Sequence, residues 1–426
     1  MTGLLARADR EERLLVPVSS SRVCSRLSIG ISLAGLALLT AVAALSRAPL
    51  VYDEAPYLKP VALLHHDGLS LRFLHDYPEP AGLLHNVLHW VLEPLTGLKP
   101  PGVRLVNPVL LGLTILVSFL TLRLLVSEQP LGNSLAIIAI PSIWTLTGMV
   151  LTEMPAIFLT SLSVYLLLLS RQIVPGGRMV ASTAALVGGM MLGAAFLSRA
   201  SVLVVLGALP CLALTNWRSA AAYALGALLV AGPIIGYWGG LVPPQSVVPV
   251  ATSSISAYNT ILSVCYAATM MLILAPRWFD VRARWALPLV GAIILLNALT
   301  GVVEIPVLRS TIARLPEVFA RAVPRLAGGA MLALASLFLF CSLKHIYVRR
   351  HDPVWLFLCF AMLLLIVSPG KITHQFSSRY TGMAAGLMVL ASAPFAASVP
   401  WAMAGQVIGM LIGLASLLSY YGLAGN

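Results

Sequence analysis

The segment LSIGISLAGLALLTAVAALSR, residues 27–47, is followed immediately by APLVYDEAPYL, residues 48–58. The first stretch is an apolar run of the length that a helix needs to cross a bilayer, roughly 20 residues. The second places two adjacent carboxylates, Asp53 and Glu54, where that helix would leave the membrane. Paired acids at a membrane surface repel each other and lose hydration, so they usually serve a cation, a metal ion or a reaction.

The composition extends the membrane interpretation to the whole chain. Of its 426 residues, 59% are hydrophobic and 10% are charged, whereas soluble globular chains carry about 25% charged residues. The net charge is +12, but the basic residues lie between apolar runs instead of forming one polar domain. They are therefore expected to set topology and to contact anionic lipid, and nucleic-acid binding is not expected. The five cysteines show no C-x-x-C spacing, so no zinc site or disulfide framework is indicated.

Thirteen apolar runs predict an all-α, polytopic transmembrane helical bundle. About 11–13 of them are expected to span, because some short or closely spaced runs are candidates for half-helices or hairpins. The runs lie near residues 27–47, 105–126, 132–150, 153–171, 180–197, 200–215, 219–238, 257–275, 285–304, 326–346, 353–368, 380–397 and 401–423.

The basic residues also orient the chain. Arginines in residues 1–26 predict a cytoplasmic N-terminal tail, followed by a single transmembrane domain over residues 27–423. The longer loops then fall on the extracytoplasmic side, where they carry most of the acidic residues and six of the eight histidines. We therefore expect the chemistry on that side. These loops are residues 48–104, 239–256, 304–325 and 369–379.

The first of these loops, residues 48–104, is expected to form short amphipathic helices on the membrane surface. One helix is predicted over residues 55–66, before a turn at Asp67-Gly68. A second is predicted over residues 81–92, closed by Pro94. Both are too short and too polar to cross the bilayer.

A first span followed at once by an Asp-Glu pair and a loop of short surface helices resembles the GT-C superfamily of integral-membrane glycosyltransferases. That family includes protein O-mannosyltransferases, lipid A aminoarabinose transferases and dolichol-pathway glucosyl- and mannosyltransferases. The matching stretch is YDEAPYLKPVALLHHDG, residues 52–68, and PEPAGLLHNVLHW, residues 78–90, is similar to a proline-rich segment in several of these enzymes. The resemblance implies a GT-C fold, with the catalytic base at Asp53 and Glu54 beside it.

The resemblance further implies an inverting hexosyl- or pentosyltransferase. Such an enzyme moves a sugar from a polyprenyl-phosphate donor to a lipid, glycan or protein acceptor at the extracytoplasmic face. The short loops favour a bacterial plasma (inner) membrane. Because the phosphate leaves as a stable anion, the reaction needs a carboxylate to accept a proton and cations to hold the phosphate. The alternative is that Asp53 and Glu54 only cap a surface helix that starts near Pro56.

Cations for the phosphate are predicted in two places. One is a short turn between apolar runs, and the other is the segment SPGKITHQFSSRYT, residues 368–381, which belongs to the donor-site loop 368–379. Its Arg-Tyr pair resembles one found before a late span in several GT-C families. The alternative is anchoring to lipid headgroups. The candidates are Arg199 in the turn, with Lys371, His374, Arg379 and Tyr380 in the segment.

Three further features are candidate parts of the site or of the membrane interface. Glu153 resembles the second acidic motif of GT-C enzymes, which shapes a metal or acceptor site, although helix capping explains it equally well. His85 and His89, with Glu93, lie at i, i+4 and i+8, a spacing that could hold a divalent metal, and no other cofactor is indicated. Residues 304–325 form a basic amphipathic segment that is expected to lie in the membrane interface.

Two other functional classes fit the sequence less well. A transporter or flippase of lipid-linked sugars or other anions would use the same cations but would place charges in the middle of spans. Here the interiors of the apolar runs are nearly free of charge, which favours chemistry at a surface. A non-catalytic scaffold would leave the Asp-Glu pair without a purpose.

Overall fold

In the computed structural model, residues 18–172, 178–246, 255–305, 316–372, 376–396 and 400–422 are described. Every regular element within these ranges is a helix, which confirms the predicted all-α polytopic bundle. Most of the predicted tail 1–26 lies outside the described residues. The middle of the segment 304–325 and His374 lie outside them as well.

Nine helices in the described part of the chain are long and apolar enough to cross a membrane, or ten if one bent pair counts as a span. The short helices η1 (Gly102–Leu105) and η6 (Ser368–Lys371) extend two of these spans. The spanning helices are α2 (Val18–Leu45), α7 (Val106–Leu124), α10 (Glu153–Gln172), α11 (Arg178–Ser198), α12 (Pro210–Trp238), α13 (Ala257–Leu274), α16 (Glu317–Val348), α17 (Pro353–Val367) and α20 (Pro400–Gly422).

Several predicted spans are broken in the structure, because hydropathy does not register local helix breaks. The run 132–150 contains α8 (Pro130–Leu135), η2 (Ala136–Ala139) and α9 (Pro141–Gly148), and the two halves are bent by 76°. The run 200–215 is divided between η4 (Ala200–Ala208) and the start of α12, which is kinked at Asn216. Proline at the start of α9 cannot donate a backbone hydrogen bond to the preceding turn, so it favours a new helix there.

The remaining apolar runs give shorter helices. Residues 380–397 form α18 (Ser378–Gly382), α19 (Ala385–Ser392) and η7 (Ala393–Phe395), and residues 285–304 form most of α14 (Ala283–Thr300). Residues 317–325 of the predicted interfacial segment are the first turns of α16 and continue without a break into its apolar part. That part of the segment therefore belongs to a long helix.

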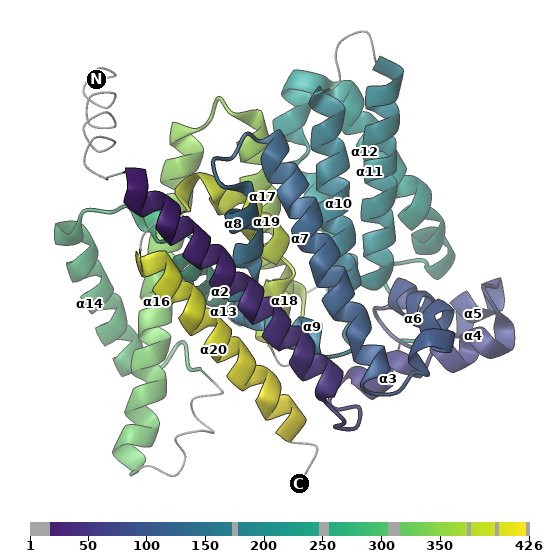
Figure 1. Cartoon of the computed structure of the whole chain (residues 1–426), viewed down its shortest axis with the longest axis horizontal. Helices are drawn as coiled ribbons and strands as arrows, with labels where there is room; N and C mark the ends of the chain where they lie inside the picture. Colours follow the sequence, from purple (N-terminus) through teal and green to yellow (C-terminus); the bar gives the residue numbers. More distant parts are fainter. Residues whose placement is uncertain are drawn as a thin grey trace.

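The helices pack in two groups that Figure 1 shows plainly. α7, α10, α11 and α12 stand side by side, and α14 and α16 form a pair on the other side of the bundle. The backbones of α11 and α12 are in direct contact: a Cβ built on Gly189 would lie 1.9 Å from the carbonyl oxygen of Tyr223, and one built on Gly226 would lie 2.1 Å from that of Leu186. Small residues allow this approach in membrane proteins, where van der Waals packing drives helix association.

The first loop forms four short helices at one end of the bundle, which we call the loop face (Figure 1). Two small buried clusters support it, one made of Leu64, Phe73, Tyr77 and Leu83 and the other of Leu58, Val61, Val103 and Val150. The loop is therefore a folded layer with its own core. Its helices are α3 (Glu54–Leu58), α4 (Val61–Asp67), α5 (Leu71–Asp76) and α6 (Leu83–Thr96).

The predicted turn at Gly68 is present, with φ at +61°. Two boundaries differ from the prediction. The predicted helix 55–66 is divided near Pro60 into α3 and α4, and α6 continues through Pro94 to end at Gly97, whose φ is +61°. A proline near the end of a helix removes one hydrogen bond, whereas the glycine adopts the left-handed conformation that commonly ends helices.

Candidate active site

Glu54 is a fully buried carboxylate whose two oxygens are both occupied. The guanidinium of Arg104 donates from Nε to Oε1 at 2.9 Å and from Nη2 to Oε2 at 2.5 Å, and neither side chain is exposed. The backbone N–H groups of Val51 and Val150 donate to the same oxygens at 2.8 and 2.9 Å. Because neither oxygen is accessible to a reacting group, this geometry favours a structural role for Glu54 over the catalytic one expected from its place beside Asp53.

Arg104 joins the acidic loop to the transmembrane helices. It lies in η1 at the start of the α7 span, and the ring of Tyr421, at the end of α20, lies 4.5 Å from its guanidinium carbon. Its other donors bind the chain that leaves α2. They reach the hydroxyl of Ser46 at 3.1 Å and the carbonyl oxygens of Ala48 and Pro49 at 3.0 and 2.8 Å. The Glu54–Arg104 pair thus fixes the acidic loop to the ends of two spans.

Asp53 points to a different partner. Tyr52 before it has a left-handed backbone, with φ at +53°, and successive side chains at a helix start point about 100° apart. Asp53 occupies the N-cap position of α3 but makes no capping hydrogen bond, so capping does not explain it. Its carboxylate pairs with Arg379. With 32% of its side-chain surface exposed, Asp53 is the accessible member of the Asp-Glu pair.

Arg379 lies in α18 and contacts two carboxylates. Its Nη2 donates to Asp53, and its Nε lies 3.6 Å from Oε1 of Glu153, at the start of α10. Only 7% of its side chain is exposed. Burial acts to lower the pKa of Arg379, but Glu153, two tyrosines and Asp53 together raise that pKa above its ordinary value. The guanidinium is therefore a permanent positive charge.

Arg199 follows α11 directly and completes the charged cluster. It donates to Glu153 and, at 3.2 Å, to the hydroxyl of Tyr57. Glu153 is fully buried and 15% of the Arg199 side chain is exposed. Burial acts to lower the pKa of Arg199, whereas Glu153 and Tyr57 raise it overall. We call Asp53, Glu153, Arg199 and Arg379 the charged cluster, and in it Glu153 lies between the two arginines.

Tyrosine rings line the charged cluster. The ring of Tyr380 lies 5.2 Å from the guanidinium carbon of Arg379 and 5.9 Å from that of Arg199. Tyr52 lies 5.4 Å from Arg379 and Tyr57 lies 5.7 Å from Arg199. Each ring can therefore stabilise a guanidinium through a cation–π contact, and the hydroxyl of Tyr380 also accepts from Nη2 of Arg379 at 3.4 Å.

Three guanidinium nitrogens of the charged cluster have no hydrogen-bond acceptor among the described residues. They are Nε of Arg199 and both Nε and Nη1 of Arg379. A buried donor left unpaired costs about 1–3 kcal/mol, and a guanidinium presents its donors in the geometry that fits phosphate and carboxylate oxygens. The charged cluster is therefore suited to bind an anion with several oxygens next to the accessible carboxylate of Asp53.

Of the other predicted phosphate ligands, Lys371 is not part of the charged cluster. Lys371 is exposed at the end of η6, and His374 lies outside the described residues. No ion pair of Lys371 is seen among the described residues. Phosphate binding by these two residues stays a prediction.

The predicted metal ligands His85 and His89 are both fully buried on α6, with ring centroids 4.3 Å apart. Burial lowers the pKa of His85 well below its ordinary value and that of His89 to about 4. Glu93 does not join them, because it pairs with His65 at 2.5 Å. Within the described ranges no three His, Cys, Asp or Glu side chains are grouped to hold a metal ion. Metal binding by the two histidines stays a prediction.

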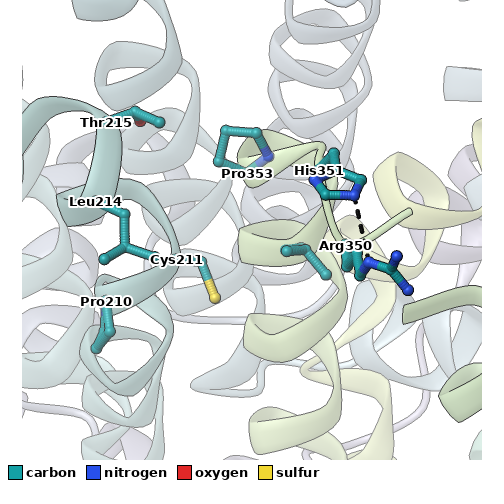
Figure 2. A pocket seen from close by; sticks show the side chains of 8 residues that line it. Pro210, Cys211, Leu214, Thr215, Arg350, His351 and Pro353 are labelled. Atoms are coloured by element: carbon teal, nitrogen blue, oxygen red, sulfur yellow. Dashed lines mark hydrogen bonds between the residues drawn. The ribbon is translucent and has the colours of Figure 1, made fainter. Parts of the chain in front are cut away.

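A pocket of about 370 Å³ lies between the start of α12 and the start of α17 (Figure 2). In it, Nε of Arg350 donates to the ring of His351 at 3.3 Å. None of the predicted site residues lines this pocket, so it is separate from the candidate site. Its lining residues are Pro210, Cys211, Leu214, Thr215, Arg350, His351, Pro353 and Leu356.

The sequence reasoning missed Arg104, Tyr52 and Tyr57. Arg104, like Arg199, is a charged residue at the edge of an apolar run. At this position, anchoring to lipid headgroups also explains an arginine, so the sequence did not distinguish it as a site residue. Tyr52 and Tyr57 flank the Asp-Glu pair at −1 and +4 relative to Asp53. Their proximity to the acids was the available signal for a contact with the site.

No protein-family model matches the chain, and no sequence of a curated protein matches it. Among solved structures it is similar to two crystal structures of ArnT from Cupriavidus metallidurans. For the structure bound to undecaprenyl phosphate, the identity is 17%, the TM-score is 0.44, and the match covers 89% of this chain and 78% of the other. For the apo structure, the values are 16%, 0.43, 85% and 76%. At identities this low, the likeness assigns no role to any residue.

Proposed function

We propose that this chain is an inverting membrane glycosyltransferase of the GT-C type. It transfers a sugar from a polyprenyl-phosphate donor to a lipid, glycan or protein acceptor at the extracytoplasmic face of a bacterial plasma membrane. One observation carries the proposal: the accessible carboxylate of Asp53 pairs with Arg379, and Arg379 and Arg199, which share Glu153, keep guanidinium nitrogens without acceptors among the described residues. This combination provides a base next to a phosphate site.

In the proposed reaction, Asp53 accepts the proton of the acceptor hydroxyl as its oxygen attacks the anomeric carbon of the sugar. The bond between that carbon and the phosphate oxygen breaks on the opposite side, so the configuration inverts. Arg379 and Arg199 stabilise the charge on the departing polyprenyl phosphate. Glu153 keeps the two arginines charged and in position, and Tyr57 and Tyr380 support them from the sides.

The position of the charged cluster favours an enzyme over a flippase. Glu153 is the first residue of α10 and Arg199 follows the last residue of α11. Both therefore lie at the ends of spans, on the loop face with Asp53. A carrier that moves an anion across the bilayer is expected to place charged residues deep within its spans. Chemistry at the membrane surface needs them only at this end.

The test is a transfer assay with purified protein in detergent and labelled polyprenyl-phosphate sugars. The wild-type protein should release polyprenyl phosphate, and Asp53→Asn should lose at least about a hundredfold in rate, as expected for removal of a general base. Asp76→Asn is the matched control, because Asp76 is an acid of the same loop with no contact to the charged cluster among the described residues. Full activity of Asp53→Asn would exclude Asp53 as the base.

A further inference from the structure

Arg379 is shared between two carboxylates that differ in how tightly they are held. Glu153 is fully buried and contacts both arginines, so it cannot leave without stranding two charges. Asp53 contacts Arg379 alone in the charged cluster and is one-third exposed. Of the two acids, Asp53 is therefore the one that can be displaced from Arg379 by another anion.

The ion pair also occupies the group that the proposed reaction needs. Nη2 of Arg379 donates to Oδ2 of Asp53, so this oxygen already accepts a hydrogen bond from a guanidinium and has one lone pair fewer for the hydroxyl of an acceptor. In this arrangement the base is paired with the cation that is expected to hold the phosphate. The Asp53–Arg379 contact thus occupies both the group expected to accept the proton and the group expected to bind the phosphate.

We propose that Asp53 and the phosphate of the donor compete for Arg379. In the absence of the donor, the Asp53–Arg379 ion pair keeps the base inactive. The phosphate takes the place of Asp53 on Arg379 and frees the carboxylate to accept the acceptor's proton. This inference rests on the proposed function, because it assigns a phosphate ligand to the same site.

A phosphate can make more contacts with the arginines than Asp53 does. It offers several oxygens, whereas Asp53 offers one contact, and three nitrogens of Arg199 and Arg379 are without acceptors among the described residues. A phosphate can engage both guanidinium groups at once, and two or more parallel contacts of this kind add energy and geometric specificity that a single contact lacks. Replacing the single Asp53 contact therefore satisfies donors that Asp53 leaves unpaired.

The exchange gives the reaction an order. The acceptor can be deprotonated only when the donor is already bound, which prevents Asp53 from acting without a sugar to transfer. After transfer, Asp53 carries the proton and the phosphate holds Arg379. Once Asp53 releases its proton to solvent, the restored carboxylate competes again for Arg379 and assists the departure of the polyprenyl phosphate.

Equilibrium binding of a short-chain polyprenyl phosphate, farnesyl phosphate, tests the proposal without any sugar or turnover. Because Asp53 competes with this ligand, Asp53→Asn and Asp53→Ala should bind it more tightly than the wild type, by roughly twofold to fivefold, the range expected for a partly exposed ion pair. Arg379→Gln should bind it more weakly. In the Arg379→Gln background, Asp53→Asn should produce no gain, because the contact being competed for is gone.

The matched control is Glu317→Gln at the start of α16, on the same end of the bundle (Figure 1). It removes one negative charge from an exposed pair with Arg321 and should leave the affinity unchanged. A gain equal to that of Asp53→Asn would show a general effect of charge and overturn the competition. Unfolding temperatures of all variants in the same detergent identify any loss of binding caused by misfolding.

The outcomes separate the two proposals. Wild-type transfer activity without tighter binding by either Asp53 variant would refute the competition and leave the enzyme assignment in place. Tighter binding by both Asp53 variants without transfer by the wild type would support the competition and refute the enzyme, leaving a phosphate-binding carrier. Equal affinity for farnesyl phosphate in the wild type, Asp53→Asn and Arg379→Gln would refute Arg379 as a phosphate ligand.

Discussion

Replacing Arg104 by glutamine should destabilise the protein strongly. Arg104 makes five hydrogen bonds, two buried ones to Glu54 and three partly buried ones to Ser46, Ala48 and Pro49. Its loss leaves the Glu54 carboxylate buried with two backbone donors and no counter-charge. Removing one partner of a buried ion pair typically costs about 3–5 kcal/mol. A glutamine that restores one hydrogen bond recovers about 1 kcal/mol, so we expect a loss of about 2–4 kcal/mol.

The free energy of unfolding can be measured by titrating detergent micelles with a denaturing detergent, for Arg104→Gln, Glu54→Gln and the double variant. The double variant should be more stable than the sum of the single changes predicts, because it removes both charges together. We expect a coupling of about 2 kcal/mol or more. Arg321→Gln is the control, since its exposed pair with Glu317 contributes little.

Two results would refute this reasoning. Arg104→Gln could unfold at the same denaturant concentration as the wild type, or the single changes could add without coupling. Either result would mean that the pair does not hold the acidic loop. A transfer assay on Arg104→Gln at a temperature where it stays folded would then locate any remaining role in the chemistry.

The other predictions concern stability and topology. His89 has a pKa of about 4, lowered by burial from 6.5. Between these values the unfolded chain binds a proton that the folded chain does not, so the free energy of unfolding should fall with decreasing pH by up to about 1.4 kcal/mol per unit. The free energy of unfolding should fall less steeply with decreasing pH for His89→Leu. An unchanged slope would contradict the lowered pKa of His89. Gly189→Val should lower the unfolding temperature sharply because its Cβ would meet the α12 backbone, whereas Gly232→Ala, with open space around it, should not. The topology can be tested with Leu69→Cys and Val126→Cys in a cysteine-free background, because both positions are exposed. An impermeant thiol reagent should label the two cysteines from opposite sides of the membrane. Labelling of both from the same side would contradict the topology.

The fold class could be predicted because apolar runs are long and charges are few. In such a chain each charged residue is informative, since burying it needs a partner. Asp53, Glu153, Arg199 and Arg379 were selected on that basis, and the structure brings all four together. They could be assigned to one site although they are far apart in sequence, because each lies at the end of a predicted span on the same side of the membrane.

The pairing of these residues could not be predicted. Asp53 and Glu54 are adjacent and chemically alike, and only the backbone at Tyr52 and the start of α3 sends them in different directions. Arg104 carries the same sequence signal as an arginine that anchors to headgroups, and its burial depends on the chain that leaves α2. Half-helices or hairpins were expected among the short or closely spaced runs, but the positions of the breaks near Pro141 and Asn216 could not be predicted, because hydropathy averages over the residues that cause them.

The two acidic residues also differ in when their partners are made. Glu54 and Arg104 are 50 positions apart, whereas Asp53 and Arg379 are 326 positions apart. At a synthesis rate of about 5–20 residues per second, Arg379 follows Asp53 by roughly 15 to 65 s. Arg104, which binds the first loop, is thus synthesised soon after Glu54, whereas Arg379 is synthesised long after Asp53. The charged cluster can therefore be complete only after Arg379 has been synthesised and inserted.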